Sequence, residues 1–139
     1  MNGVEFLDTN ILVYAYDSSD PSKRRTAQQL LRQALDGQMV ISPQVLAEFS
    51  AILLHKVAPA VKPSDVVAIL DALAPIRVVA TDAEIARRAV EAHAKYSVHF
   101  YDGMIIASAE RGQCSRLWTE DLNDGQSYFG VIAKNPFSG

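Results

Sequence analysis

The sequence has little of what stabilises or targets a secreted or membrane protein. It contains a single cysteine, Cys114, so no disulfide bond can form within the chain. A chain without an internal disulfide bond is typical of proteins in a reducing cytoplasm. No apolar run approaches the roughly 18 residues of a membrane-spanning helix. Residues 1–5 show neither the basic start nor the long apolar stretch of a secretory signal. We therefore expect a cytoplasmic protein with no membrane span.

An excess of positive charge is also lacking. The chain has 13 lysines and arginines against 16 aspartates and glutamates, and its formal net charge is −3. Because nucleic-acid-binding proteins are often basic overall, a polyanionic partner would have to meet a local cluster of cations. Lys23-Arg24-Arg25 and Arg87-Arg88 are two such clusters. The solvated face of a helix is the commoner explanation of either cluster, because surface helices are normally charged.

Length and hydrophobicity indicate one domain with a substantial core. The chain has 139 residues, a size typical of a single domain, and 49 % of them are hydrophobic. No internal repeat, low-complexity segment or linker divides the sequence. We therefore expect a single domain over residues 1–139.

Predicted strands and helices alternate along the chain. Short runs rich in β-branched and aromatic residues predict strands at residues 4–7, 39–41, 77–80, 116–119 and 130–133, the last at an edge of the sheet. Apolar periodicity and capping signals predict helices at about residues 11–16, 21–35, 43–55, 63–73, 82–95 and 102–111. Thr81 and Glu84 have the spacing of a capping box. We therefore expect an α/β fold of three layers, in which helices cover both faces of a central parallel sheet.

Asp8 follows the first predicted strand directly. In open parallel sheets, ligands bind outside the carboxyl ends of the strands. If the first strand is central, Asp8 lies at such a position. A structural alternative stays open at this point, because aspartate is also a good N-cap for the helix that follows.

Glu48 and Asp102 are acidic residues at helix positions that apolar periodicity would assign to the buried side. Glu48 lies three residues after Val45 and four before Ile52, and Asp102 lies three before Ile105. A buried carboxylate is costly unless a positive charge meets it. The alternatives are a glutamate at the edge of the apolar stripe and an aspartate that favours the first helical turn.

Asp121 follows the predicted strand at residues 116–119, so it is expected at the same edge of the sheet as Asp8. Its alternative role is that of a turn residue in the segment Asp121-Leu122-Asn123-Asp124-Gly125. One acidic pocket explains all four carboxylates together. They would repel one another unless a cation bound there, and carboxylate oxygens with water suit Mg²⁺ or Mn²⁺. Such a site activates water for phosphoryl displacement.

Four segments resemble, in order, the motifs of PIN-domain nucleases, and most closely those of VapC-type toxins from toxin–antitoxin pairs. They are Phe6-Leu7-Asp8-Thr9-Asn10, the helix with Glu48, the segment Tyr101-Asp102-Gly103-Met104-Ile105-Ile106-Ala107, and Trp118-Thr119-Glu120-Asp121-Leu122-Asn123-Asp124-Gly125. The resemblance spans nearly the whole chain. It implies an α/β/α sandwich that cleaves RNA with Mg²⁺ or Mn²⁺. The implied catalytic and metal-binding residues are Asp8, Glu48, Asp102 and Asp121.

The resemblance also implies supporting residues and partners. Thr9 corresponds to a small polar residue that supports the site by hydrogen bonding, Asn10 belongs to the same motif, and Thr119 matches a hydroxyl residue near the fourth acid. Asp124 is either a fifth carboxylate or an outer partner of Asp121. The implied partners are an RNA substrate, a cognate antitoxin protein and a second copy of the chain in a homodimer.

Three alternative functions can be compared with the sequence. A PIN fold can serve as an RNA-binding or RNA-processing module outside a toxin–antitoxin pair. A phospho-receiver-like signalling domain also has acids at strand ends, but it would usually have a lysine at a late strand end, and none is placed so here. A haloacid-dehalogenase-like phosphatase is excluded, because it requires Asp-x-Asp after the first strand and this chain has Asp8-Thr9-Asn10.

Overall fold

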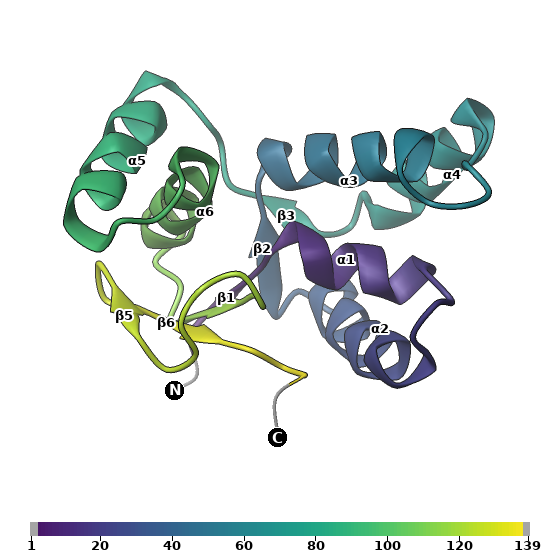
Figure 1. The fold of residues 1–139 in the computed structure, drawn as a ribbon, viewed down its shortest axis with the longest axis horizontal. Coiled ribbons are helices and arrows are strands. Elements are labelled where there is room, and N and C mark those ends of the chain that lie inside the picture. The colour runs from purple at the N-terminus through teal and green to yellow at the C-terminus, as the bar shows by residue number, and fades with distance from the viewer. Residues whose placement is uncertain (1–2, 138–139) are drawn as a thin grey trace.

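The computed structural model describes residues 3–137, and the chain forms the predicted layered α/β/α architecture (Figure 1). Met1 and Asn2, which begin the stretch used above to argue against a secretory signal, lie outside the described residues. Within residues 3–137, none of the helices combines the length and the hydropathy needed to cross a membrane.

The central sheet is almost entirely parallel, with the strand order β3-β2-β1-β4-β6-β5. Its strands are β1 (Glu5–Leu7), β2 (Met39–Ile41), β3 (Arg77–Val78), β4 (Arg116–Trp118), β5 (Ser127–Tyr128) and β6 (Val131–Lys134). The central strand β1 pairs in parallel with β2 on one side and with β4 on the other. The first strand of the chain is therefore central, which is the condition that the argument about Asp8 required.

The C-terminal end of the sheet differs from the prediction. The strand expected at the edge, now β6, lies inside the sheet between β4 and β5, and β5 pairs with it antiparallel. The hairpin turn consists of Phe129 and Gly130, whose φ angles are 50° and 85°. Two positive φ angles are typical of the tight turns that join hairpin strands. The sequence did not reveal this turn because a bulky residue such as Phe129 seldom adopts positive φ.

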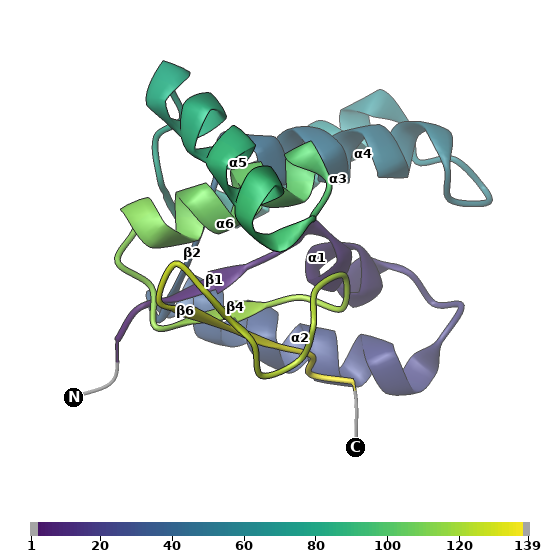
Figure 2. The same cartoon turned by 60° about the vertical axis from the view of Figure 1, so that its left-hand side comes forward.

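Six helices cover the sheet within the described residues, namely α1 (Thr9–Tyr16), α2 (Pro21–Leu35), α3 (Pro43–His55), α4 (Pro63–Leu73), α5 (Ala83–Tyr96) and α6 (Phe100–Arg111). The layers follow from their packing: α2 contacts β2, whereas α6 contacts β4 and β6. Figure 2 shows α2 on one side of the strands, with α5 and α6 on the other. Both faces of the sheet are thus buried, as expected for a parallel sheet.

Two predicted helix starts need correction. The N-cap of α5 is Asp82 rather than Thr81, because an Asp82 side-chain oxygen accepts hydrogen bonds from the backbone N–H groups of Glu84 and Ile85. Helix α6 begins at Phe100, two residues earlier than predicted, with His99 as its N-cap. Asp102 therefore lies in the first turn of α6, and not at its start.

The buried core surrounds β1. Its strand residues Phe6 and Leu7 have no exposed surface. The same is true of Ile11 on α1, Phe49 on α3 and Ile106 on α6. Burial of a large apolar side chain contributes about 1.5–3 kcal/mol to stability. The burial of these side chains in one cluster holds the start of α1 and the middles of α3 and α6 around the end of β1.

Candidate active site

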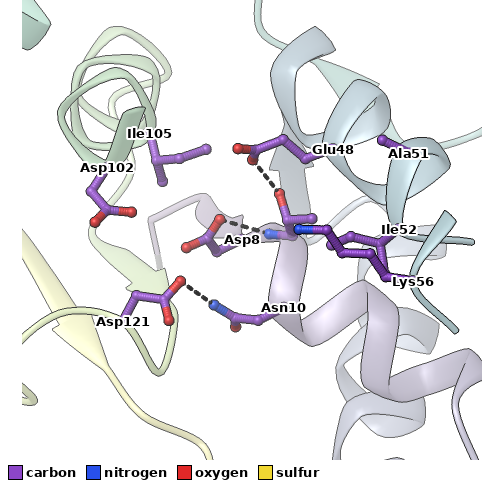
Figure 3. Close-up of a pocket in the computed structure, with 10 residues that line it drawn as sticks. Asp8, Asn10, Glu48, Ala51, Ile52, Lys56, Asp102, Ile105 and Asp121 are labelled. Atoms are coloured by element: carbon purple, nitrogen blue, oxygen red, sulfur yellow. Dashed lines mark hydrogen bonds between the residues drawn. The ribbon is translucent and has the colours of Figure 1, made fainter. Parts of the chain in front are cut away.

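A pocket of about 290 Å³ lies beyond the carboxyl end of β1 (Figure 3). Helices α1, α3 and α6 and the loop after β4 enclose it. The residues that line the pocket are Asp8, Thr9, Asn10, Glu48, Ala51, Ile52, Lys56, Asp102, Ile105 and Asp121. The fold thus brings four carboxylates from four separate segments to one cavity.

Asp8 is the N-cap of α1 and also lines the pocket, so capping the helix does not prevent it from facing a ligand. Its Oδ1 accepts a hydrogen bond of 2.6 Å from the Thr9 backbone N–H, and its Oδ2 accepts one of 2.8 Å from the Thr119 hydroxyl. Only 4 % of Asp8 is exposed. Both of its oxygens are therefore oriented by the fold.

Burial raises the pKa of Asp8 from 3.8 to about 7. The hydrogen bonds from Thr119 and Thr9 favour the charged form and oppose this rise. The negative charges of Asp121 and Asp102 add to it. A pKa this high means that the neighbouring protein groups offset only part of the cost of burying the negative charge of Asp8. A bound cation would offset more of that cost.

Glu48 and Asp102 are half-buried on opposite walls of the pocket. The Thr9 hydroxyl donates a hydrogen bond of 2.8 Å to Glu48 Oε1 and so orients that carboxylate. Burial, followed by the charges of Asp121 and Glu48, raises the pKa of Asp102, while His99 opposes the rise. Within residues 3–137, no group donates a hydrogen bond to the Asp102 carboxylate.

Asp121 is exposed at the mouth of the pocket. Its Oδ2 accepts a hydrogen bond of 2.8 Å from Asn10 Nδ2, and its backbone N–H donates one of 3.1 Å to the Thr119 hydroxyl. Asn10 and Thr119 therefore hold the loop after β4 against the start of α1. These two contacts join Asp121 to the segment that carries Asp8.

Asp124 does not belong to this group. It is not among the residues that line the pocket. Its Oδ1 instead accepts a hydrogen bond of 2.8 Å from the Asn135 backbone N–H and lies 4.0 Å from Lys134 Nζ. This position argues against the expectation of a fifth carboxylate or an outer partner of Asp121, and it favours a structural role that joins the loop to the end of β6.

The oxygen atoms of the side chains in the pocket are suitable ligands for a small, hard cation. Within residues 3–137, no three acidic, histidine or cysteine side chains are already gathered closely enough to enclose a metal ion. Mg²⁺ does not require such a cage, since it usually binds one or two carboxylates and keeps several waters. The buried Asn10 Oδ1 has no hydrogen-bond partner among residues 3–137, which leaves one more oxygen acceptor on a residue of the pocket wall. Burial is the main cause of the raised pKa values of Asp8 and Asp102, and the negative charges of the neighbouring acids add to it.

One residue of each basic cluster is occupied by contacts within the protein. Lys23 Nζ lies 3.1 Å from Glu120 Oε2. Arg88 donates hydrogen bonds to both carboxylate oxygens of Glu110, and its guanidinium lies 3.5 Å from the centre of the Phe129 ring. These contacts favour the structural alternative for Lys23 and Arg88.

Sequence reasoning missed Lys56, which lines the pocket. The helix predicted at residues 43–55 ends one residue before Lys56. The signal was its spacing, because Lys56 follows Ile52 by four residues and Glu48 by eight and so continues the same helical face.

Comparisons with known proteins show which family the chain belongs to. The family model described as PIN domain matches residues 6–124. A comparison with curated protein sequences finds no match. A solved structure of a toxin–antitoxin complex from Klebsiella pneumoniae contains a chain that is 26 % identical, with a TM-score of 0.69 over 96 % of this chain and 98 % of that one.

Two further solved structures share the fold at lower identity. VapC20 from Mycobacterium tuberculosis, described as a toxin that cleaves the sarcin–ricin loop, is 18 % identical, with a TM-score of 0.68 over 84 % of this chain and 89 % of that one. A chain of VapBC2 from Rickettsia felis, bound to a promoter DNA fragment, is 22 % identical, with a TM-score of 0.64 over 95 % and 98 %. Because the family match covers most of the sequence, the chain belongs to the PIN-domain family.

Proposed function

We propose that this protein is a metal-dependent endoribonuclease, and that it is the toxin of a toxin–antitoxin pair. The observation that carries the proposal is the meeting of Asp8, Glu48, Asp102 and Asp121 in one pocket at the carboxyl edge of the sheet. Membership of the PIN-domain family supports the nuclease activity. Membership of the PIN-domain family also argues against the alternative of a phospho-receiver-like signalling domain.

The proposed reaction is hydrolysis of an RNA phosphodiester by water in line with the leaving oxygen, which leaves a 5′-phosphate and a 3′-hydroxyl. A bound Mg²⁺ or Mn²⁺ ion supplies the activation of water and the charge neutralisation that this reaction needs. Asp8 and Asp102 are the principal residues that would hold the ion. Glu48 and Asp121 would complete the site, directly or through water, and would help to deprotonate the attacking water.

The neighbouring polar residues have positioning roles in this proposal. The Thr119 hydroxyl and the Thr9 backbone N–H orient Asp8, and the Thr9 hydroxyl orients Glu48. Asn10 orients Asp121. A site whose supporting contacts are made in advance loses less energy to reorganisation during the reaction.

The nuclease activity can be tested with purified protein and structured RNAs. Cleavage is expected with Mg²⁺ or Mn²⁺, and it should be lost in EDTA and in the variant Asp8→Asn. The variant Asp124→Asn is a matched control, because it also removes one carboxylate charge but lies outside the pocket. Cleavage that persists in EDTA and in Asp8→Asn would disprove the mechanism.

The toxin role is supported by the similarity to a chain of the Klebsiella pneumoniae toxin–antitoxin complex. An acidic pocket attracts a positively charged segment of a protein partner, since a cleft with charge of one sign concentrates the opposite sign. The partner we propose is a cognate antitoxin encoded beside this chain. Expression of this protein alone should slow growth, and co-expression of the neighbouring gene should relieve the effect.

The same growth assay separates the two PIN-domain alternatives. If the protein cleaves RNA in vitro but its expression does not slow growth, the toxin role is wrong and an RNA-processing module is the better description. If it binds RNA without cleaving it, a binding module is the better description. A gene map that shows no small neighbouring reading frame would also count against the toxin role.

A homodimer is the oligomeric state that we propose. Val67 on α4 is 57 % exposed and Leu35 on α2 is 36 % exposed, so apolar side chains remain on the surface of the monomer. Light scattering should give twice the monomer mass at micromolar concentration. A monomer that retains full ribonuclease activity would refute the dimer while leaving the proposed reaction intact.

A further inference from the structure

Lys56 lies at the C-terminal end of α3, on the same helical face as Glu48 and Ile52. Successive residues on this face are four apart, so their side chains form one row along the pocket wall. Glu48 lies at the acidic end of the row and Lys56 at the other end. Figure 3 shows Lys56 on the side of the pocket opposite to Asp102 and Asp121.

Lys56 has the only positively charged side chain among the ten residues that line the pocket. It is exposed, and it has no carboxylate within ion-pair distance in residues 3–137. The other conspicuous cations differ in this respect, since Lys23 is paired with Glu120 and Arg88 with Glu110. The Lys56 ammonium group is thus free to meet an anion that enters the pocket.

An RNA backbone that approaches this pocket meets four carboxylates, so repulsion opposes binding even when a divalent cation is present. A lysine at the rim reduces that repulsion and offers a strongly hydrated point charge for a phosphate. We propose that Lys56 binds a backbone phosphate of the RNA substrate and is a substrate-binding residue of the ribonuclease reaction. This inference rests on the function proposed above, because it specifies how the same pocket receives RNA.

The position of Lys56 also determines which phosphate it meets. At 1.5 Å per residue, the backbones of Glu48 and Lys56 are about 12 Å apart along α3. The Lys56 ammonium group also lies outside ion-pair distance of every carboxylate in residues 3–137, and its side chain enters the pocket from the side opposite to Asp102 and Asp121. Lys56 therefore binds a phosphate beside the scissile one, so its loss should weaken RNA binding and raise KM with little change in kcat.

A purely structural role for Lys56 makes different predictions. A lysine near a helix C-terminus can stabilise the helix through its dipole. In that case, Lys56→Met would lower the melting temperature and leave RNA affinity unchanged. In our proposal, the melting temperature changes little because the side chain is exposed, whereas RNA affinity falls.

The test compares Lys56→Met, Lys56→Arg and Lys62→Met. Lys62 precedes α4, is exposed and does not line the pocket, so its substitution is a matched control for the loss of one charge. For the binding assay, every protein also carries the substitution Asp8→Asn, which prevents cleavage. Binding of a fluorescently labelled single-stranded RNA is then measured in Mn²⁺ and at several salt concentrations. Initial cleavage rates are measured without Asp8→Asn.

Lys56→Met should raise Kd and KM about fivefold for RNAs of any sequence, as expected when one phosphate contact is lost. The slope of log affinity against log salt should become shallower by about 0.7, the value for one contact with a single strand. Lys56→Arg should restore most of the affinity, and Lys62→Met should leave both quantities unchanged.

The inference is wrong if Lys56→Met and Lys62→Met have the same Kd and salt slope. It is also wrong if Lys56→Met loses RNA affinity only because less of the variant is folded, as measured by its melting curve. Failure of the proposed function is seen separately, as absence of cleavage by the wild-type protein in Mn²⁺. In that case the binding measurements still decide whether Lys56 contacts RNA.

Discussion

The hydroxyl of Thr119 donates a hydrogen bond of 2.8 Å to Oδ2 of Asp8, although the two residues are 111 positions apart in the sequence. They meet because β1 and β4 are parallel neighbours with Leu7 opposite Trp118, so that each strand ends at the same place. The same hydroxyl accepts a hydrogen bond from the Asp121 backbone N–H. One buried side chain thus positions two of the four acids.

Thr119→Val should weaken metal binding. The hydrogen bond from Thr119 favours the charged form of Asp8, so its removal should raise the pKa of Asp8 further. Metal binding requires the deprotonated carboxylate. We expect the affinity for Mn²⁺ near pH 7 to fall by about 10- to 100-fold, as is typical when a residue that orients a metal ligand is replaced. Calorimetric titration from pH 6 to 8.5 measures the effect. Thr26→Val, on α2, is the control, and equal affinities in the two variants would contradict the prediction.

Asp8→Asn should stabilise the metal-free protein at neutral and higher pH. Because the pKa of Asp8 is about 7 in the folded protein, compared with 3.8 for an aspartate in water, the folded state holds this proton more tightly. Its contribution to stability is complete below pH 3.8 and is lost as the pH rises through 7. Asn keeps the N-cap and carries no charge.

The free energy of unfolding in EDTA should therefore fall between pH 4 and 8 more steeply for the wild type than for Asp8→Asn. At pH 8 the variant should be more stable by roughly 1–3 kcal/mol, since a tenfold change in proton affinity corresponds to about 1.4 kcal/mol. Urea unfolding at several pH values measures this difference. If Asp8→Asn and Asp124→Asn show the same pH dependence as the wild type, Asp8 has an ordinary pKa.

Asp102→Asn should have opposite effects on stability in EDTA and on the response to metal. Burial and the charges of Asp121 and Glu48 raise the pKa of Asp102, so removing its charge should stabilise the metal-free protein by roughly 1 kcal/mol. Mn²⁺ should raise the melting temperature of the wild type, because a ligand of the native state stabilises it, and should raise that of the variant much less.

Four melting curves test this prediction: wild type and Asp102→Asn, each in EDTA and in millimolar Mn²⁺. If Asp102 only stabilises the first turn of α6 through the helix dipole, the variant should lose a few tenths of a kcal/mol in EDTA. It should then respond to Mn²⁺ as the wild type does. That result would remove Asp102 from the proposed metal site.

Gly103→Ala should destabilise the fold. A Cβ atom at Gly103 would lie 2.6 Å from the backbone oxygen of Ala89, so α5 and α6 would have to move apart. Such overpacking typically costs about 1–3 kcal/mol. Without the close contact, the same change inside a helix would stabilise the protein by about 1 kcal/mol. The sign of the change in urea midpoint therefore distinguishes the two cases.

Most elements of the fold were predictable because their signals are local. Asp20 before Pro21 and Ser42 before Pro43 act as N-caps of α2 and α3, as capping rules predict. The hairpin of β5 and β6 was not predictable, because its turn places Phe129 at positive φ and β5 has only two residues. The capping-box spacing from Glu84 predicts Thr81 as the cap of α5, but Asp82 is also a good cap, and only the geometry selects Asp82.

The sequence by itself determined which acidic side chains stand at strand ends and on inward helix faces, since strand and helix periodicities are properties of neighbouring residues. The tertiary structure alone decided which of them meet. It placed Asp121 beside Asn10 and Asp124 beside Asn135, although both acids lie in one loop. It also turned Lys56 toward the pocket and paired Lys23 with Glu120. Contacts between residues so far apart in the chain depend on how helices pack on the sheet, and no local pattern encodes that packing.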